Sequence, residues 1–453
     1  MGRVRRAHLL TALLEHGQVH RVANVKAYVM RSNLVGLSEL HRIPGESKYL
    51  RTVLMAWQDI VERWLYITGG TNQGGYFRED YFLPNPKGTH IAETCVTVTW
   101  LQMNLQLLQL TGEPRFVDKV ERTTYTHPFA DQYPTGERWC YLTPLKGRRA
   151  HGPGINCCVS SSRSPRGITW APTFSYGVTR FPHCAAPAVL MFECSRVQLR
   201  MGQRAIELIH TSYFPAQGFS RLCLRMKAPR RFPLCVRAPE WALPLEAQIP
   251  GLRLMRQTQP GWRVLPQRLW RDGDTVKLRY GLGPRLIRGR YGNTGPATLR
   301  WGPFVLAYDR GRNVEGAIAS AVGSVEPFQV ACVVDPHAGL ILQTGSLRTR
   351  YGVRGVFKLV PSADAGAASG DYQVWRSGPD PGWRSSVNRE HRGKPSEVQQ
   401  STLLRPPAIL LGYSPAKPFR YFWISPSEPL WCVVLAFRLM GTNQLKTSVY
   451  GQS

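Results

Sequence analysis

Residues 92–112 read AETCVTVTWLQMNLQLLQLTG and decide the fold of the first third of this chain. Apolar residues recur there at three- and four-residue spacing along two rows, which predicts a helix buried between neighbouring elements. Glu93 and Cys95 are two residues apart, so on a regular helix their side chains would point away from each other. We therefore expect the two to straddle the start of the helix, and Thr111-Gly112 to end it.

A second polar group follows about sixty residues later, where Asn156-Cys157-Cys158 comes after a loop rich in Pro and Gly. Zinc favours sulfur ligands and accepts a carboxylate oxygen, so Glu93, Cys95, Cys157 and Cys158 form a plausible four-ligand set if the fold brings them together. The alternative is that these cysteines are small buried apolar residues, because they lack the close CxxC spacing of a zinc ribbon.

Further motifs extend along the chain in a fixed order and resemble the core of glycoside hydrolase family 127, the β-L-arabinofuranosidase-like enzymes. The resemblance covers roughly His20 to Trp375. The motifs that carry it are Tyr66–Gly70, Asp80–Asn85, His90–Gln102, Val120–Tyr125, Trp139–Leu145 and Gly154–Ser161.

The resemblance implies a zinc cofactor held by Glu93, Cys95, Cys157 and Cys158, with Cys157 as the nucleophile. The chemistry agrees, since a free thiol with a pKa of ~8.5 is mostly protonated at neutral pH, and coordination to zinc deprotonates it. The thiolate would attack the anomeric carbon and form a thioglycosyl intermediate, where other retaining glycosidases use a carboxylate.

The proton donor of this reaction is the main departure from the family. Family members carry a glutamate at the second place of a Gly-Glu-x-Phe stretch, and this sequence has Gly74-Gly75-Tyr76-Phe77. Glycine thus stands at the expected acid/base position, which puts catalytic activity in doubt. Glu79 and Asp80 lie a few residues further on and are the candidate replacements, with Glu79 taken as the catalytic residue.

Two sugar-binding residues are also implied by the resemblance, Glu121 and Tyr141. Each has a simpler interpretation. Glu121 can be a solvated helix residue, and Tyr141 can be an aromatic residue of the core.

The fold class expected is α + β and multidomain: a partial (α/α)6-type helical barrel followed by antiparallel β-sandwich domains. Apolar periodicity predicts helices over Val22–Leu40 and Tyr49–Leu65. After about residue 170, alternating runs such as Thr275–Tyr280 indicate strands with one wet face. The domain boundaries expected are 1–170 for a truncated α/α-barrel catalytic domain, 171–290 for a β-sandwich, 291–378 for a second β-sandwich region and 379–453 for a mostly irregular tail.

The formal charge of +29 and the pI of 10.2 raise the question of a nucleic-acid partner. The basic residues are scattered singly and in pairs, and no zinc-finger, RNP-like or phosphate-loop motif occurs, so we interpret them as decoration of a globular scaffold. Apolar runs are too short for a membrane span, no convincing signal peptide is present, and the ligand thiols must stay reduced. We therefore expect a cytoplasmic protein without membrane or nucleic-acid partners; the oligomeric state stays open.

Two functional hypotheses follow from these residues. The first is a retaining glycoside hydrolase with a zinc-bound cysteine nucleophile, whose partner is a glycan that contains arabinofuranosides. The second is a catalytically impaired relic of that fold, with a structural zinc and carbohydrate binding. The intact ligand set favours the enzyme, and Gly75 favours the relic.

Overall fold

The structure is a computed structural model of all 453 residues. It describes residues 13, 17–22, 26–43, 45–71, 74–77, 83, 91–133, 136, 138–152, 164–181, 184–313, 330–335, 339–344, 347–348, 354–355, 358–366, 370–377 and 409–411. The tail expected at 379–453 lies outside the described residues, except for the strand Ile409–Leu411.

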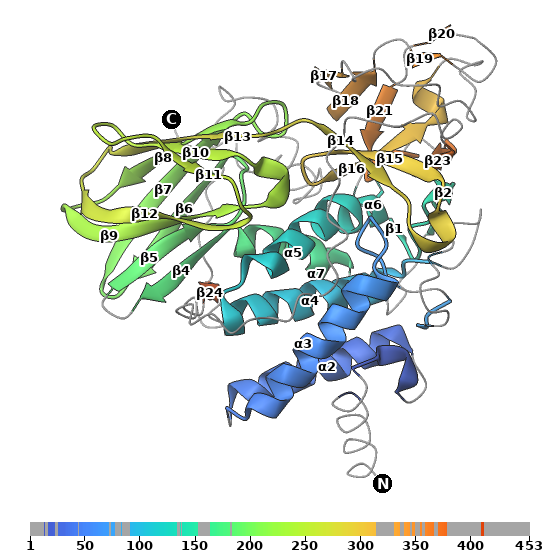
Figure 1. Ribbon diagram of the computed structural model, residues 1–453, viewed down its shortest axis with the longest axis horizontal. Helices are drawn as coiled ribbons and strands as arrows, with labels where there is room; N and C mark the ends of the chain where they lie inside the picture. Colours follow the sequence, from blue (N-terminus) through green and yellow to red (C-terminus); the bar gives the residue numbers. More distant parts are fainter. Residues whose placement is uncertain are drawn as a thin grey trace, which may run out of the picture.

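Helices make up the first part of the chain (Figure 1). Their bounds are α2 Ala27–Arg42, α3 Ser47–Asp59 with a π-helical continuation at Ile60–Trp64, α4 Thr94–Thr111, α5 Pro114–Thr126, α6 Pro128–Asp131 and α7 Ser164–Thr169. The helices expected at Val22–Leu40 and Tyr49–Leu65 are thus confirmed, with ends shifted by a few residues. Pro128 begins α6, because proline fits the first turn of a helix, where its missing N–H is not needed.

Helix α4 has the ends that the sequence predicts. Glu93 precedes it as the N-cap with extended backbone, and Gly112 ends it in the left-handed conformation, where its N–H donates to Leu108 O. Trp100, Leu101 and Met103 have no exposed surface, so the helix is buried on most sides. α2, α5 and α7 pack against it, and α4 is therefore the centre of the helical domain.

A β-sandwich follows the helices. Its six-stranded sheet has the order β11-β10-β13-β8-β7-β6 and its five-stranded sheet the order β12-β9-β5-β4-β24. The first sheet comprises β6 Ser195–Met201, β7 Arg204–Ser212, β8 Phe219–Arg225, β10 Leu245–Gln248, β11 Met255–Gln257 and β13 Thr275–Tyr280. The second comprises β4 Tyr176–Phe181, β5 Cys184–Val189, β9 Arg230–Ala238, β12 Gly261–Trp270 and β24 Ile409–Leu411.

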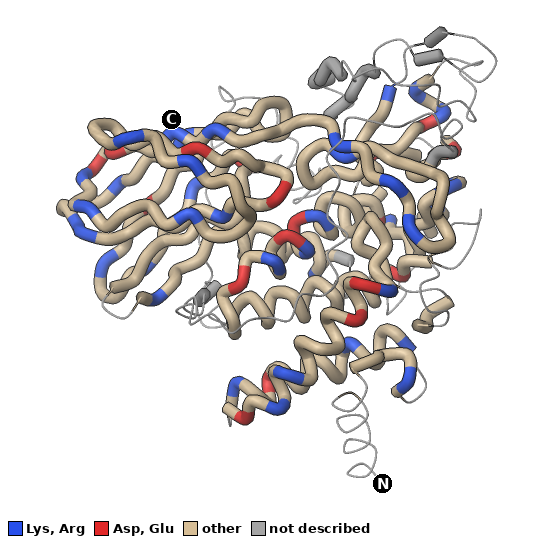
Figure 2. The backbone as a smooth tube through the Cα atoms, viewed as in Figure 1, with Lys and Arg blue, Asp and Glu red and all other residues tan. Residues whose placement is uncertain are grey.

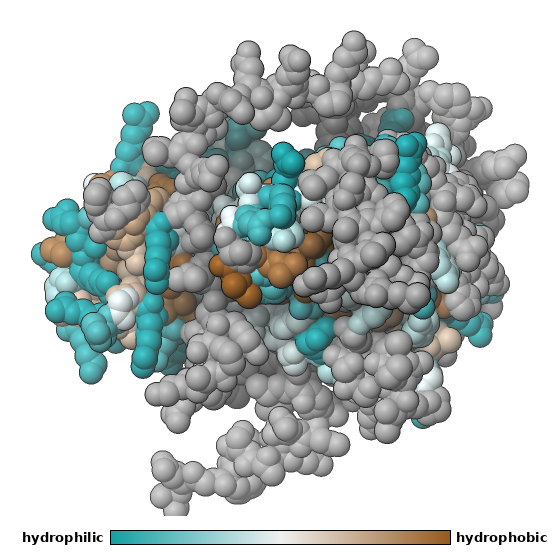
Figure 3. Space-filling view, turned by 90° about the horizontal axis from the view of Figure 1, so that it is seen from below, coloured by the Kyte–Doolittle hydropathy of each residue, from teal (hydrophilic) through white to brown (hydrophobic). Residues whose placement is uncertain are grey.

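Burial in the sandwich follows the alternation of the sequence. In β13, Val276, Leu278 and Tyr280 are buried, and the basic residues between them are exposed. Lys and Arg are scattered along the strands of the sandwich (Figure 2). Hydrophilic residues also prevail at the sandwich end of the molecule in Figure 3. This distribution is that of a globular scaffold with a wet outer face.

A nine-stranded sheet holds most of the remaining strands, and its main path is β14-β15-β16-β21-β18-β17. The path comprises β14 Pro284–Arg288, β15 Pro296–Trp301, β16 Phe304–Asp309, β17 Val330–Asp335, β18 Gly339–Thr344 and β21 Lys358–Pro361. Three short strands join it off this path, namely β2 Lys146–Gly147, β22 Tyr372–Gln373 and β23 Arg376–Ser377. β2 pairs with β22, so a segment from the helical part of the chain forms a strand of this sheet.

Two further strand pairs are small: β1 Trp139–Cys140 with β3 His151–Gly152, and β19 Leu347–Arg348 with β20 Arg354–Gly355. Short 3₁₀ turns occupy Val19–Arg21, Ala171–Phe174, Glu240–Ala242, Tyr291–Asn293 and Arg310–Arg312. Helical domain plus β-sandwich is the expected fold class, which is confirmed. Within the described part of the chain, no helix is long and apolar enough to cross a membrane.

Candidate active site

Backbone hydrogen bonds fix the start of α4 to the segment that carries Tyr141. The N–H of Thr94 donates to Tyr141 O at 3.0 Å, and its hydroxyl donates to Cys140 O at 2.9 Å. The N–H and the hydroxyl of Thr97 both donate to Glu93 O at 3.0 Å. These contacts satisfy backbone groups that a helix end leaves without intrahelical partners. They also fix the direction in which Glu93 leaves the backbone.

Ala92, directly before the cap, has an unusual backbone. Its φ is +55°, in the left-handed region that a residue with a Cβ rarely adopts. Its carbonyl accepts from the N–H of Thr143 at 3.3 Å. Gly70 approaches so closely that a Cβ added there would lie 2.4 Å from the Cβ of Ala92. Backbone strain of this kind persists only where the surroundings over-determine it, and it clusters at functional sites.

Glu93 and Cys95 come together as the sequence predicts. Glu93 is 7% exposed and Cys95 4%, and the Sγ of Cys95 lies 3.8 Å from Oε2 of Glu93. Zinc bonds of about 2.3 Å to sulfur and 2.0–2.2 Å to oxygen, at the tetrahedral angle, separate two such ligand atoms by about 3.5 Å. The pair therefore fits two adjacent corners of a zinc site.

The other two expected ligands, Cys157 and Cys158, lie outside the described residues, and so does Glu79. Within the described ranges, no cluster of three or more His, Cys, Asp or Glu side chains is placed to hold a metal. The four-ligand site and the roles of Cys157 and Glu79 therefore stay predictions.

Gly75 lies directly beside the Glu93 carboxylate. A Cβ at residue 75 would be 3.0 Å from Oε1 of Glu93. The φ of Gly75 is +82°, and its carbonyl accepts from the N–H of Ala27 at 2.9 Å, which ties this turn to the start of α2. The position where the resemblance expects the acid/base thus adjoins the Glu93–Cys95 pair, but it carries no side chain.

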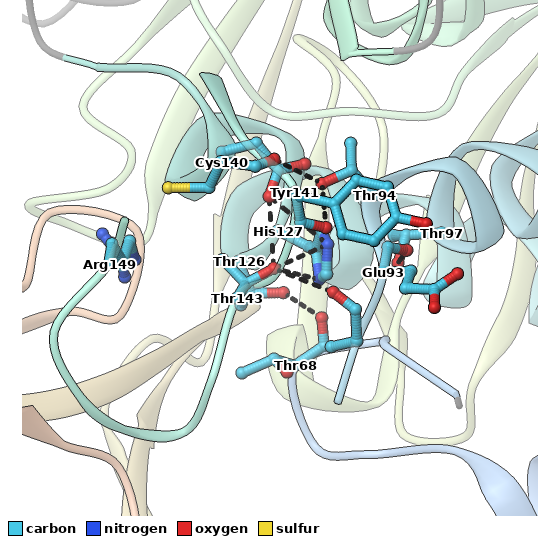
Figure 4. A network of polar contacts seen from close by, with 12 residues as sticks. Thr68, Glu93, Thr94, Thr97, Thr126, His127, Cys140, Tyr141, Thr143 and Arg149 are labelled. Carbon is cyan, nitrogen blue, oxygen red and sulfur yellow. Dashed lines mark hydrogen bonds and ion pairs between the residues drawn. The ribbon is translucent and has the colours of Figure 1, made fainter. Parts of the chain in front are cut away.

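A buried polar network that the sequence did not predict supports the start of α4 (Figure 4). The hydroxyl of Thr143 lies 2.7 Å from Nε2 of His127 and donates to Oδ1 of Asp131 at 3.1 Å. The oxygen of the same hydroxyl also lies 3.3 Å from Ala92 O, which is an alternative acceptor for its single hydrogen. The only signal in the sequence is a His and an Asp four residues apart on either side of Pro128.

Burial shifts the pKa of both titratable groups of this network toward the neutral form. Burial, and secondarily the nearby Arg149, lowers the pKa of His127 to about 3. Burial raises the pKa of Asp131 well above its ordinary value, although its hydrogen bonds oppose that shift. Both shifts favour the uncharged forms, as burial away from water does, and the network acts as a polar support. In Figure 4 the Glu93 carboxylate points away from it.

Arg31 of α2 is another buried polar residue that the sequence did not predict. Its side chain is fully buried. The Nη1 atom donates to Val96 O, in the first turn of α4, at 2.6 Å, and Nη2 donates to the hydroxyl of Thr71. The guanidinium lies over the rings of Trp100 and Phe77, with its carbon 5.0 and 5.8 Å from their centroids. An arginine inside the apolar stripe of a helix gives no sequence signal that separates it from a surface arginine.

Glu121 is buried, so the interpretation as a solvated helix residue is wrong. Its Oε1 forms an ion pair with Nη2 of Arg237 at 2.6 Å, and its Oε2 accepts from Nε1 of Trp241 at 2.8 Å. Both partners belong to the sandwich part, so the carboxylate joins α5 to it. Tyr141 is half-buried, and its backbone O holds the start of α4. The sugar-binding roles of Glu121 and Tyr141 stay predictions.

Comparisons with known proteins agree with this geometry. The model of the β-L-arabinofuranosidase GH127 catalytic domain matches residues 8–165, and that of the GH127 middle domain matches residues 188–282. Over 114 residues, which are 24% of this chain and 17% of the relative, the sequence is 29% identical to the non-reducing end β-L-arabinofuranosidase of Bifidobacterium longum subsp. longum.

Solved structures share the fold. The GH127 β-L-arabinofuranosidase of Geobacillus stearothermophilus T6 aligns with a TM-score of 0.67 and 19% identity, over 78% of this chain and 60% of that one. A second solved protein, described as a GH127 β-arabinofuranosidase, aligns with a TM-score of 0.66 and 21% identity, over the same shares.

The architecture, a helical domain with a buried Glu-Cys pair followed by β-sandwiches, therefore defines the class of protein as glycoside-hydrolase-like. Within that class, the chain belongs to glycoside hydrolase family 127. It spans 17% of the length of the curated relative and 60% of the solved structures described above.

Proposed function

We propose that this chain is a retaining glycoside hydrolase that acts on β-L-arabinofuranosides, with Cys157 as its nucleophile. The observation that carries the proposal is the buried pair of Glu93 and Cys95, whose Oε2 and Sγ atoms lie 3.8 Å apart at the start of α4. Burial removes this carboxylate and this thiol from water, and a cation bound between them would offset that cost. The names of the relatives supply the substrate class.

Glu93, Cys95, Cys157 and Cys158 would hold the zinc. When bound, zinc supplies the charge that keeps the thiol of Cys157 deprotonated. The thiolate sulfur attacks the anomeric carbon, a C–S bond forms, and the glycosidic C–O bond breaks with its electron pair on the leaving oxygen. An acid protonates that oxygen, and the same group then removes a proton from the water that breaks the C–S bond. Glu79 is the candidate for this acid/base role.

The second candidate function is a catalytically impaired relic with a structural zinc and carbohydrate binding. Gly75 is the observation that favours it, because a glycine has no proton to donate. The two candidates share the metal site and differ in turnover. Activity therefore separates them only after the metal site has been tested by itself.

Metal content tests the site. The full chain, purified under reducing conditions, should contain about one zinc per molecule, and Cys95→Ser should lose it. Cys223→Ser is the matched control, because Cys223 is a free, partly exposed thiol on β8 of the sandwich. Stoichiometric zinc in the Cys95→Ser protein would show that the site is wrongly assigned.

Turnover separates the two functions. An activated aryl arabinofuranoside has a leaving group that departs without protonation, so Cys157 suffices for the first step, whereas a natural disaccharide also needs the acid. We expect a burst of aryl product with slow turnover, and almost no hydrolysis of a disaccharide. Efficient disaccharide hydrolysis that is lost in Glu79→Gln would assign the acid role to Glu79. If the zinc-loaded protein gives no burst, the hydrolase is rejected and the catalytically impaired relic is supported.

A further inference from the structure

Four basic side chains gather where α5 meets the sandwich and the nine-stranded sheet. Lys119 and Arg122 are three residues apart on α5, so they are neighbours on one face of that helix. Arg285 of β14 and Arg300 of β15 are partners in the antiparallel register, so their side chains leave the same face of the sheet side by side. These four residues are called the basic cluster below.

Contacts between the three parts of the fold bring the two pairs together. The Nη2 atom of Arg285 donates to Glu240 O at 3.0 Å, in the 3₁₀ turn of the sandwich part. The next residue of that turn, Trp241, donates from Nε1 to Oε2 of Glu121 on α5 at 2.8 Å. Helix α5 also packs against β16, the strand beside β15. Figure 2 shows acidic and basic residues next to one another on α5.

The carboxylates around the basic cluster do not neutralise it. The two carboxylates of α5, Asp118 and Glu121, both form ion pairs with Arg237. Glu240 is exposed, and its charge favours the charged form of Arg300 without an ion pair to it. Among the residues that the structure describes, no carboxylate lies within 4.0 Å of any cationic group of the basic cluster. Its positive charges are therefore left in excess.

Buried donors and mutual repulsion show that the basic cluster is incomplete. The Nε atoms of Arg122 and Arg300 are buried, and in the described part of the chain neither has a hydrogen-bond partner. Burial, and then the charge of Arg300, lowers the pKa of Arg122 to about 10. Burial, and then the charge of Arg122, lowers the pKa of Lys119 to about 7. Surface cations avoid one another by turning into water, but these inner nitrogen atoms are held away from it. An anion among them would oppose all of these effects.

We propose that the basic cluster binds a tetrahedral oxyanion with two negative charges, of the phosphate or sulfate class. A guanidinium binds such an anion through two parallel N–H···O bonds, and an ammonium adds a point charge. Four cations and the single carboxylate of Glu240 leave three positive charges, which a dianion matches better than a monocarboxylate does. All four side chains of the basic cluster are partly exposed, so an ion reaches them from solvent.

The oxyanion has two sources with the same chemistry, namely the free inorganic ion and an ester group on a sugar. The site lies on α5, β14 and β15, and none of the expected zinc ligands belongs to it. It therefore stands or falls independently of the proposed glycosidase activity.

The test is calorimetric titration of the full chain with sodium sulfate at low ionic strength, with sodium chloride as the blank. We expect saturable binding at one site. Arg122→Gln and Arg300→Gln should each weaken it by about 10-fold or more, because hydrogen bonds to charged groups contribute that much. Arg263→Gln is the matched control and should bind sulfate unchanged. Arg263 is a partly exposed arginine of β12 whose Nε is likewise buried without a partner among the described residues, but it lies outside the basic cluster.

Thermal stability provides a second readout, in which an anion site and a structural role differ in sign. Without sulfate, Arg300→Gln should melt at the same temperature as the unaltered chain or higher, because it removes a like charge directly opposite Arg285. Sulfate should raise the melting temperature of the unaltered chain more than that of Arg300→Gln. Arg263→Gln reports the general stabilisation by sulfate. A purely structural Arg300 would instead give a lower melting temperature and an unchanged sulfate increment.

Galactose 6-sulfate and unmodified galactose distinguish the two sources of the oxyanion. Tighter binding of galactose 6-sulfate than of inorganic sulfate, with no binding of galactose, supports an ester on a sugar; equal or weaker binding supports the free ion. The proposal is overturned if the unaltered chain gives no saturable sulfate binding, or if Arg300→Gln binds sulfate as tightly as Arg263→Gln. If Arg122→Gln does not fold, the comparison of Arg300→Gln with Arg263→Gln decides.

Discussion

Glu121→Gln is the most discriminating perturbation outside the metal site, because sugar binding and structural support predict different results. Arg237 is fully buried, and its guanidinium bonds Asp118 at 2.7 Å, Glu121 at 2.6 Å and Leu190 O at 2.7 Å. Glutamine keeps the shape and an acceptor for the Trp241 N–H, but it removes the charge. Asp118 then remains as the one carboxylate paired with Arg237 among the described residues.

The expected magnitude follows from the burial of this pair. Breaking a buried ion pair by removing one partner costs about 3–5 kcal/mol, since the other charge stays buried. Because Asp118 retains half of the compensation, we expect a loss near the lower end, about 3 kcal/mol. Glu207→Gln is the control, because it breaks the more exposed Arg196–Glu207 pair on the sandwich surface. That change should cost about 0.2–1 kcal/mol.

The assay is urea unfolding of the full chain followed by tryptophan fluorescence, together with a double-mutant cycle that combines Glu121→Gln with Arg237→Met. Neighbours that share one ion pair should show a coupling of about 0.5–3 kcal/mol. The reasoning is refuted if Glu121→Gln changes the free energy of unfolding by less than about 1 kcal/mol but abolishes arabinofuranoside binding. That result would make Glu121 a sugar contact, as the family resemblance predicts.

Two further predictions concern pH and backbone geometry. Burial lowers the pKa of His127 and His210 to about 3, below the ~6.5 of the unfolded chain, so the stability that each neutral imidazole contributes is present above pH 6.5 and lost as the pH falls toward 3. Between pH 7 and pH 5 the free energy of unfolding of the unaltered chain should fall, and in a variant with either histidine changed to Gln this fall should be smaller by about 2 kcal/mol. An unchanged pH profile in the variants would contradict this. Gly70→Ala should unfold the chain or cost several kcal/mol, because the added Cβ would lie 2.4 Å from the Cβ of Ala92. Gly36→Ala should instead stabilise the chain by about 0.5–1 kcal/mol, because Gly36 lies in open space on α2. Equal urea midpoints for the two variants would refute the clash.

The fold was predictable where one local signal dominates. Residues 92–112 combine a continuous apolar pattern with a glycine stop, and both ends of α4 fall where these signals place them. Thr275–Tyr280 alternates with period two and is β13 with the same bounds. The pairing of β2 with β22 was not predictable, because it joins residues more than two hundred positions apart and each strand has only two residues. Such short strands carry no periodicity.

Of the predicted zinc ligands, only Glu93 and Cys95 lie among the described residues, and their ligand roles stay predictions. Side chains two residues apart on a regular helix point away from each other, so Glu93 and Cys95 can approach only if the helix begins between them. This constraint predicted the extended backbone that Glu93 has as the N-cap of α4. Arg31 and His127 could not be predicted, since their importance arises from burial, and burial depends on which helices pack around them. A charged residue becomes informative only when the structure shows that water has been removed from it.

The conformation of Gly75 bears on how the missing acid must be interpreted. A residue with a Cβ at φ +82° would cost roughly 1–2 kcal/mol, and its Cβ would lie 3.0 Å from Oε1 of Glu93. Any side chain placed on this backbone would therefore crowd the Glu93 carboxylate at its first carbon. The turn at residues 74–77 is built for glycine, so loss of the acid and the shape of the loop go together. Hydrolysis of a natural linkage by this chain consequently requires an acid from another position, and Glu79→Gln is the variant that decides whether Glu79 supplies it.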